Sequence, residues 1–390
     1  MPDWQKTGLK LLHYRKKART SQFVKNNEWL KFKLRKILIY LALPLVFMLT
    51  GARQMPAGEK EIKPKNFIIV IVDGAGVAEW SAGAAMSSGG LQVGKFPYMG
   101  LMKVWGGDNF TPDAYANATA IATGQRTTDG ILSMNSNGVP MKTLAECARD
   151  RKMLTGLISV SSVTSASAAA FFDHEDLGVN DEKIALGITK FKPDILIGGG
   201  KKYFSDRADK RNLVDTFMIK RYEMITKQKK AEKFTGSKTF ALLSDEDMPQ
   251  VVKRGNFLSE VCLSAIRNMA ACFEGYFLII HDGHIGQAMK YNSPGYMCEE
   301  IKDVNRALAT LYNTAPNMDE TLVVVLSPGE TGGFVFNGGS VKSGAVFGSW
   351  ASQKPTATMV PVFASGPGAE KFAGIYDNTD VFAKVLSLMR

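Results

Sequence analysis

Phe67-Ile-Ile-Val-Ile-Val-Asp-Gly-Ala-Gly76 shows which class of fold this chain adopts. Six apolar residues follow one another, and five of them are β-branched. Such a run predicts a strand that is covered on both faces, as the central strands of parallel sheets are. The run stops at Asp73, and the glycines that follow permit a sharp turn. We therefore expect the Asp73 carboxylate at the carboxyl end of a buried strand.

Further apolar runs alternate with helical segments along the rest of the chain. Thr143-Leu-Ala-Glu146 is a capping box that predicts the start of a helix. Apolar residues at helical spacing between 301 and 312 predict a crossover helix. The sequence therefore predicts an α/β fold, a three-layer α/β/α sandwich with a mostly parallel central sheet. The other strands are expected at residues 156–160, 194–198, 276–281, 321–326 and 360–366, and the polar stretch 201–238 is expected to be a surface excursion.

In sheets of this kind, ligands bind beyond the carboxyl ends of the strands. This rule predicts that four polar stretches meet along one edge of the sheet. They are Asp73, residues 161–167, residues 281–284 and residues 326–331.

The positive charge of the chain is concentrated at its N-terminus. The whole chain has 48 Lys or Arg against 37 Asp or Glu, a formal net charge of +11. Residues 1–54 contain 12 of the basic residues and only two acidic ones. A nucleic-acid-binding domain would carry its basic surplus in the folded body. The nearly neutral body therefore argues against a nucleic-acid partner.

An uncharged apolar run, residues 37–52, follows the basic N-terminal segment 1–36. Its length suits the apolar core of a signal peptide, and the lysines and arginine just before it would keep that end in the cytoplasm. We expect an exported protein, periplasmic or otherwise extracytoplasmic. Both a cleaved signal peptide and an uncleaved anchor, which would contact the membrane through residues 37–52, are consistent with this pattern. Residues 53–65 are expected to be a linker and residues 66–390 the folded domain.

The four cysteines are scattered and contain no Cys-x-x-Cys pair, which predicts buried thiols rather than a disulfide framework or a zinc knuckle. They are Cys147, Cys262, Cys272 and Cys298.

From about Lys65 onward the sequence resembles the alkaline phosphatase family. The resemblance rests on the order and spacing of several segments: Ile71-Val-Asp-Gly-Ala-Gly76, Ala118-Thr-Ala-Ile-Ala-Thr-Gly-Gln-Arg-Thr127, Thr155-Gly-Leu-Ile-Ser-Val-Ser-Ser-Val-Thr164, Ile195-Leu-Ile-Gly-Gly-Gly200, Glu330-Thr-Gly-Gly333 and Ala357-Thr-Met-Val-Pro-Val-Phe-Ala-Ser-Gly-Pro367. It implies phosphomonoester hydrolysis by a Ser or Thr nucleophile at a helix N-terminus. It also implies two zinc ions, a magnesium ion and an Arg that clamps the phosphate. A hydroxyl nucleophile needs such cations because they lower its pKa and stabilise the transferred phosphoryl group.

Most of this equipment is missing at the matching positions. Asp73 matches the family's metal-bridging Asp, but the nucleophile motif reads Asp113-Ala114-Tyr115, so a methyl group replaces the attacking hydroxyl. The magnesium stretch offers only Ser165 and Ser167, of which Ser167 could still supply an oxygen. No Arg occurs between residues 174 and 191, where the clamp is expected.

The remaining zinc-ligand positions are also changed. Without a gap in the match, one segment gives His281, Gly286 and Lys290, and an ammonium group repels a metal ion. The next positions are Pro328-Gly329 and Pro355. Only Asp73 survives among the zinc ligands, so the sequence predicts that zinc and magnesium are no longer cofactors.

The histidines leave one further metal hypothesis. His281, Asp282 and His284 could form a rebuilt mononuclear site with Asp73, but strand alternation places only His281 on the side of Asp73. We favour a polar strand end without metal, and we expect His174 to be a structural histidine beside a helix.

One anion-binding feature could persist without the chemistry. The helix that begins after Asp113 presents the backbone amides of Asp113 and Ala114 and the positive end of its dipole, and Gly124 closes it. A phosphoester could bind there without turnover.

Three functions follow as hypotheses. The favoured one is an exported, catalytically inactive alkaline phosphatase-like protein that acts in binding or scaffolding, with an unknown protein or a phosphoester as its partner. The second is an active metal-dependent phosphomonoesterase or phosphodiesterase with a rebuilt site. The third is a membrane-tethered interaction module that works through its basic N-terminus.

Overall fold

The expected strand at residues 67–72 is the centre of the sheet. In the computed structural model, which describes residues 62–389, it is β1, Asn66–Val72. It pairs in parallel with β7, Tyr276–Asp282, on one side and with β8, Thr321–Leu326, on the other. All seven residues of β1 are buried, as a strand covered on both faces must be.

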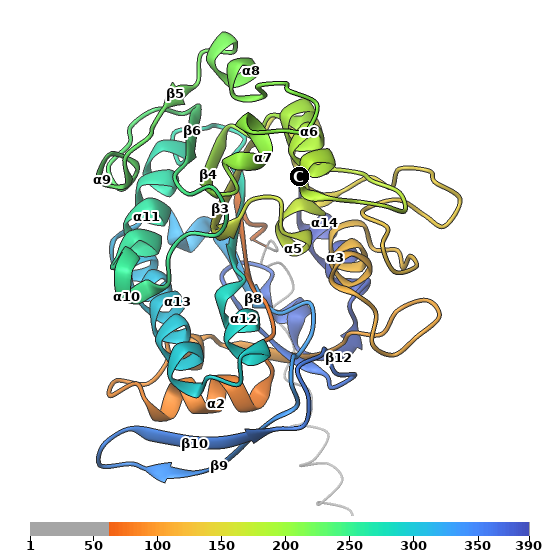
Figure 1. Cartoon of the computed structure of the whole chain (residues 1–390). Helices are drawn as coiled ribbons and strands as arrows, with labels where there is room; N and C mark the ends of the chain where they lie inside the picture. The colour runs from red at the N-terminus through yellow and green to blue at the C-terminus, as the bar shows by residue number, and fades with distance from the viewer. Residues whose placement is uncertain (1–61, 390) are drawn as a thin grey trace, which may run out of the picture. The chain divides into compact units, whose positions relative to one another are not determined.

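The sheet has ten strands in the order β12-β2-β11-β8-β1-β7-β3-β4-β6-β5 (Figure 1). Strand β11 runs antiparallel to β2 and β8, and the other pairs are parallel. The prediction of a mostly parallel sheet is therefore confirmed. The remaining strands are β2 (Tyr98–Lys103), β3 (Leu154–Ser162), β4 (Ile195–Gly199), β5 (Glu223–Met224), β6 (Thr239–Leu242), β11 (Val360–Ser365) and β12 (Gly374–Asp377).

Helices cover both faces of the sheet, and β1 shows why. Its alternate residues Phe67, Ile69 and Ile71 join the core on one face, while Ile68 and Val70 join the core on the other. The first face is packed by α3 (Ala114–Thr123), α4 (Leu144–Asp150), α5 (Ala166–Ala169), α6 (Asp181–Phe191) and α14 (Asp380–Leu388). The second is packed by α2 (Val77–Ala85), α11 (Phe257–Met269), α12 (His284–Lys290) and α13 (Pro294–Thr314). The three-layer sandwich is confirmed.

Local signals placed two of these helices correctly. The Thr143 hydroxyl accepts a hydrogen bond from the Glu146 amide at 3.2 Å, and the Glu146 carboxylate accepts one from the Thr143 amide at 3.0 Å, which completes the capping box of α4. Helix α13 is the expected crossover helix, and its residues Ile301, Val304 and Leu308 are buried.

Most residues of the stretch 201–238 are exposed, as expected for a surface excursion, but the stretch also has structure that the sequence did not predict. It contains α7 (Lys202–Ser205), α8 (Val214–Ile219), the edge strand β5 and α9 (Gln228–Ala231). Four aromatic residues between its lysines are buried, namely Phe204, Phe217, Tyr222 and Phe234. The aromatic side chains fold the stretch onto the end of the sheet, and the many lysines between them hid this packing in the sequence.

A two-stranded hairpin, β9 (Phe334–Ser340) and β10 (Ala345–Trp350), stands apart from the main sheet and contacts α2 (Figure 1). The short elements are α10 (Val251–Arg254) and three 3₁₀ turns at Gln92–Lys95, Met318–Glu320 and Ala369–Phe372.

Three of the cysteines, Cys147, Cys262 and Cys298, are buried as expected, whereas Cys272 is only half-buried. Within residues 62–389 no helix combines the length and the apolar character that crossing a bilayer requires. The segments 1–36 and 37–52, and the linker up to residue 61, lie outside the described residues. Export and membrane anchoring therefore stay predictions.

A fully buried arginine joins the second helical layer to the sheet. Arg254, at the end of α10, donates to Glu300 and to Asp303 on α13, at 2.5 and 2.8 Å. Asp282, the last residue of β7, lies 3.8 Å from the same guanidinium. Buried charges are tolerated only when they are paired in this way, because each has lost its hydration.

We predict that Arg254→Met strongly destabilises the protein, because it leaves Glu300 buried without a cation and Asp303 with Arg306 alone. The expected loss is about 3–5 kcal/mol of unfolding free energy. Thermal or urea unfolding measures it, and the adjacent exposed residue gives a matched control, Lys253→Met, which should change stability by less than about 0.5 kcal/mol. Equal stability of the two variants would contradict this role for Arg254.

Candidate functional site

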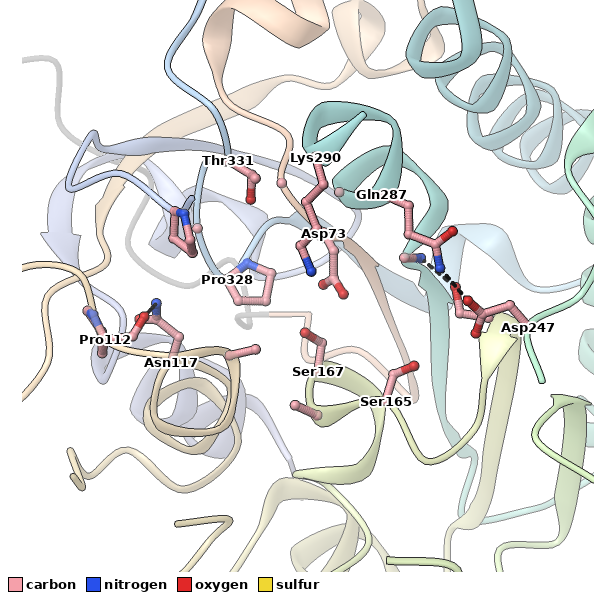
Figure 2. Close-up of a pocket in the computed structure, with 18 residues that line it drawn as sticks. Asp73, Pro112, Asn117, Ser165, Ser167, Asp247, Gln287, Lys290, Pro328 and Thr331 are labelled. Atoms are coloured by element: carbon pink, nitrogen blue, oxygen red, sulfur yellow. Dashed lines mark hydrogen bonds between the residues drawn. The ribbon is translucent and has the colours of Figure 1, made fainter. Parts of the chain in front are cut away.

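A cavity of about 270 Å³ opens at the carboxyl ends of the parallel strands (Figure 2). The four polar stretches that the sequence placed on this edge all contribute to its wall. Its lining also includes every position that the resemblance assigned to the nucleophile and the metals, apart from His281. The lining residues are Asp73, Gly74, Pro112, Ala114, Asn117, Ser161, Ser165, Ala166, Ser167, Asp247, Gly283, Gly286, Gln287, Lys290, Pro328, Gly329, Thr331 and Pro355.

Asp73 lies just beyond the end of β1 and is held by a histidine. The Nε2 atom of His281 lies 3.0 Å from Oδ2 of Asp73, and its Nδ1 atom lies 2.9 Å from the hydroxyl oxygen of Ser159. His281 is fully buried, and burial by itself would lower its pKa, but the Asp73 carboxylate outweighs burial and the pKa is raised. The second oxygen of Asp73, Oδ1, is buried without a hydrogen-bond partner among the described residues.

Two of the matched ligand positions near Asp73, Gly286 and Lys290, carry no metal-binding side chain. A Cβ atom at Gly286 would lie 3.3 Å from the Asp73 carbonyl oxygen, so position 286 faces Asp73 directly but has no side chain to offer. Gly74 has a φ of +79°, and a Cβ atom added to it would lie 2.8 Å from the Cα atom of Gly286. The segment after β1 and helix α12 can therefore approach each other this closely only because both positions are glycines. Lys290, at the end of α12, extends into the cavity (Figure 2).

Asp282 and His284 do not join Asp73. Asp282 accepts a hydrogen bond from the His284 amide and otherwise faces Arg254. The His284 ring is occupied on both sides, by the Tyr296 hydroxyl at 2.5 Å and by the backbone carbonyls of Val160 and Met248. Only His281 points toward Asp73, as expected, but strand alternation is not the reason for His284, because β7 ends at Asp282 and His284 is the first residue of α12.

The residues present do not fit a two-zinc site. Residues 62–389 contain no group of three or more His, Cys, Asp or Glu side chains arranged to hold a metal ion. Around Asp73 the matched ligand positions hold one histidine, His281, which is bonded to Asp73 and Ser159, and otherwise a glycine, a lysine, Pro328, Gly329 and Pro355. Zinc needs about four nitrogen, sulfur or oxygen ligands, and apart from His281 these side chains supply none.

The N-terminus of α3 lies at the cavity, and its first side chain there is the methyl group of Ala114. Ala114 is the first residue of α3 and is exposed in the cavity wall. The Asp113 carboxylate caps the helix, accepting from the Ala116 amide at 2.8 Å and from the Gly130 amide at 2.7 Å. Gly124 ends the helix in the left-handed conformation, as expected. Both oxygens of Asp113 are thus engaged in the fold, and Asp113 would repel an anion that approached the helix.

The floor of the cavity is formed by hydroxyls. Ser167 is buried in α5, and Ser165 directly precedes that helix and donates to the Ser162 carbonyl at 2.8 Å. Figure 2 shows both side chains on the side of the cavity below Asp73. Lys290 is the one cationic side chain among the described residues that line the cavity, and no arginine lines it.

Two lining residues gave little signal in the sequence. Asp247 follows β6, accepts from the Ser162 amide at 2.6 Å and is hydrogen-bonded to Gln287 (Figure 2). In the sequence, Asp247 belongs to the acidic run Asp245-Glu-Asp247, which is typical of a solvated loop. Asn117, on the buried side of α3, gave no signal because a single Asn in an alanine-rich helix has many explanations.

His174 lies away from the cavity, in a loop rather than in a helix. Its Nδ1 atom donates to the Ser133 carbonyl at 2.8 Å, and its Nε2 atom lies 3.3 Å from the Glu146 carboxylate of α4. Burial favours the neutral ring, but these two acceptors outweigh it and raise the pKa of His174. The histidine ties the loop to the capping box, which agrees with the structural role expected for it.

Comparison with known proteins gives consistent matches. A family model described as "Alkaline phosphatase" matches residues 64–350. Alkaline phosphatase 3 of Bacillus subtilis is 28% identical over 335 residues, which cover 81% of this chain and 69% of the relative. Alkaline phosphatase 4 of the same organism is 26% identical, with 81% of this chain and 87% of the relative covered. The solved alkaline phosphatase of the Antarctic bacterium TAB5 superposes with a TM-score of 0.77 and 31% identity, covering 84% of this chain and 98% of the other.

The contact of His174 with Glu146 predicts a pH-dependent stability. Because the folded-state pKa of His174 is raised, its contribution is complete below the unfolded pKa of about 6.5 and is lost as pH rises through the folded pKa. His174→Gln should therefore lower the melting temperature more at pH 5.5 than at pH 8.5. Thermal unfolding at both pH values measures the difference.

Glu146→Gln provides the matched background for this experiment. In that variant the penalty of His174→Gln at pH 5.5 should shrink, because the carboxylate that favours the imidazolium is gone. A penalty that is the same at both pH values would contradict the assignment.

Proposed function

Because the chain belongs to the alkaline phosphatase family, we propose that it has kept the fold and pocket of these enzymes, has lost phosphomonoesterase activity, and acts in binding or scaffolding. The observation that carries the proposal is the methyl group of Ala114 at the cavity end of α3. Covalent phosphoryl transfer needs an attacking oxygen or another nucleophile at this point, and a methyl group cannot attack.

The cation supply of the cavity supports the same proposal. Phosphoryl transfer depends on positive charge that stabilises the transferred group. Among the described residues the wall offers Lys290 alone, and Asp73 and Asp247 more than offset its charge. We expect that the protein needs neither zinc nor magnesium, because the side chains around Asp73 do not form a ligand set.

The cavity remains able to bind a small polar molecule. Its wall combines Lys290, the hydroxyls of Ser165 and Ser167, and the amides of Asn117 and Gln287. A phosphoester would meet the Lys290 ammonium and the α3 N-terminus, but also the Asp113 carboxylate, so we expect weak binding without turnover. We further propose that the protein works outside the cytoplasm, as the basic segment and the apolar run 37–52 indicate.

We predict that the purified full-length chain hydrolyses an aryl phosphate at least about 10³-fold more slowly than the TAB5 enzyme measured beside it. Any residual rate should be unchanged in Asp73→Ala. Elemental analysis after incubation with zinc and magnesium should find less than one equivalent of either metal. Stoichiometric zinc, or turnover that disappears in Asp73→Ala, would show that the site is active and rebuilt.

A second prediction concerns the nucleophile position. Ala114→Ser should fold normally, because residue 114 is exposed at the first position of its helix. It should not restore activity, since the metal ligands and the phosphate clamp are missing as well. Hydrolysis above the level of the unmodified chain, measured with the same aryl phosphate, would show that the cavity still holds the cations that phosphoryl transfer needs.

A further inference from the structure

The edge of the sheet formed by β5 is strongly basic. Between residues 210 and 238 the chain has nine Lys or Arg and three Asp or Glu. The described residues outside 201–238 have 22 basic and 28 acidic side chains, so they are net negative. The near-neutral total for the folded body therefore hides one cationic region. It comprises α8, β5 and α9, which lie together at the end of the molecule farthest from the β9–β10 hairpin (Figure 1).

Each of the three acidic residues of this region accepts a hydrogen bond from a neighbouring group. Glu232 is buried and bonded to Lys229, Glu223 accepts from the Gly236 amide, and Asp215 accepts from Asn212. Seven exposed cations between residues 210 and 238 have no acidic partner within 4.0 Å in the described part of the chain, and five of these lie between residues 220 and 233. We call these five the basic edge: Lys220, Arg221, Lys227, Lys230 and Lys233.

Two apolar side chains project beside these cations. Met218 and Ile219, at the end of α8, are 57% and 76% exposed, and Lys220 and Arg221 follow them directly. Single exposed apolar residues are common on protein surfaces. Here two adjacent ones lie beside a group of cations, so this part of the surface is amphipathic.

The segment that carries Met218 and Ile219 is held rigidly in this orientation. Phe217 and Tyr222 on either side of it are buried with ring centroids 5.1 Å apart, and the Phe217 ring lies 4.4 Å from that of Phe240 in the sheet. The Tyr222 amide donates to the Phe217 carbonyl at 3.0 Å, and Arg221 turns the chain with a φ of 60°. With Phe217 and Tyr222 buried, the four residues between them, Met218 to Arg221, all face outward.

We propose that the basic edge and the side chains of Met218 and Ile219 bind the surface of an anionic lipid membrane. Cations attract the headgroups, and the two apolar side chains enter the boundary between headgroups and acyl chains. A single-stranded nucleic acid fits less well, because the aromatic side chains on which its bases would stack are buried here. This inference stands apart from the proposed loss of phosphatase activity.

Residues 62–390 suit the test, because they lack the apolar run 37–52, which would bind membranes itself. They form one compact unit with a buried core on each face of the sheet. The match to the solved chain of the TAB5 enzyme covers 98% of that chain and 84% of this one. We therefore expect the fragment to fold by itself.

The experiment is co-sedimentation of this fragment with vesicles of phosphatidylcholine and phosphatidylglycerol at 3:1, and with vesicles of phosphatidylcholine alone. At 50 mM salt we expect binding to the anionic vesicles only, and at 500 mM salt we expect its loss. Lys220→Glu combined with Lys230→Glu should weaken binding at least about tenfold. Ile219→Ser should also weaken it, by a smaller factor, because an inserted side chain is lost.

Lys95→Glu combined with Lys342→Glu is the matched control. It makes the same change of net charge at two exposed lysines elsewhere and should alter binding by less than about threefold. Failure to bind anionic vesicles, or an equal loss in the control pair, would overturn the proposal. So would tighter binding of a single-stranded oligonucleotide that Lys220→Glu with Lys230→Glu abolishes and Ile219→Ser leaves unchanged.

Discussion

The parallel hydrogen bonding of β1 to β7 and β8 is the constraint on which the site depends. Its register pairs Val72 with Asp282 and Ile71 with Leu326, so the three strands end at the same level. Residues 73, 283 and 328 must then meet at one edge of the sheet, although more than 200 positions separate the first from the second. The register is fixed because a slip by one residue would exchange the side chains that β1 sends into its two cores.

Under the proposed function, the chain keeps the fold of this edge of the sheet and loses its chemistry. What the fold needs is retained: an apolar β1, a capped α3 and a close approach of Gly74 to Gly286. What the chemistry of phosphate transfer needs is a set of side chains that project into the cavity. In the proposed loss of activity, Ala114, Pro328 and Pro355 stand in the places of such side chains; all three line the cavity, and the sheet around them is intact. The proposed loss of activity is therefore compatible with an intact fold.

The net charge summed over a segment does not show where charged side chains are concentrated or whether they are buried. Most of the net charge of +11 lies in the N-terminal 54 residues, so the sequence indicates that the rest of the chain is nearly neutral. The body is neutral only on average, since nine basic residues are concentrated between 210 and 238. The buried ion group around Arg254 is the opposite case. Its carboxylates, Glu300 and Asp303, look like ordinary surface charges of a long helix in the sequence, yet they are buried and paired.

The sequence by itself determined the class of fold, the central strand, the capping box of α4 and the edge of the sheet where the cavity lies. These follow from local patterns: apolar runs, periodicity, and glycines or caps at element ends. It also yielded the prediction that a nucleophile and a metal ligand are missing there, because the side chains of Ala114 and Pro355 can supply neither. Only the tertiary structure decided that His281 holds Asp73 while His284 is bonded elsewhere, that Asp247 and Gln287 line the cavity, and that the aromatics of residues 201–238 are buried. The physical reason is that these facts depend on which distant segments pack together, and the register and layering of the sheet set that packing.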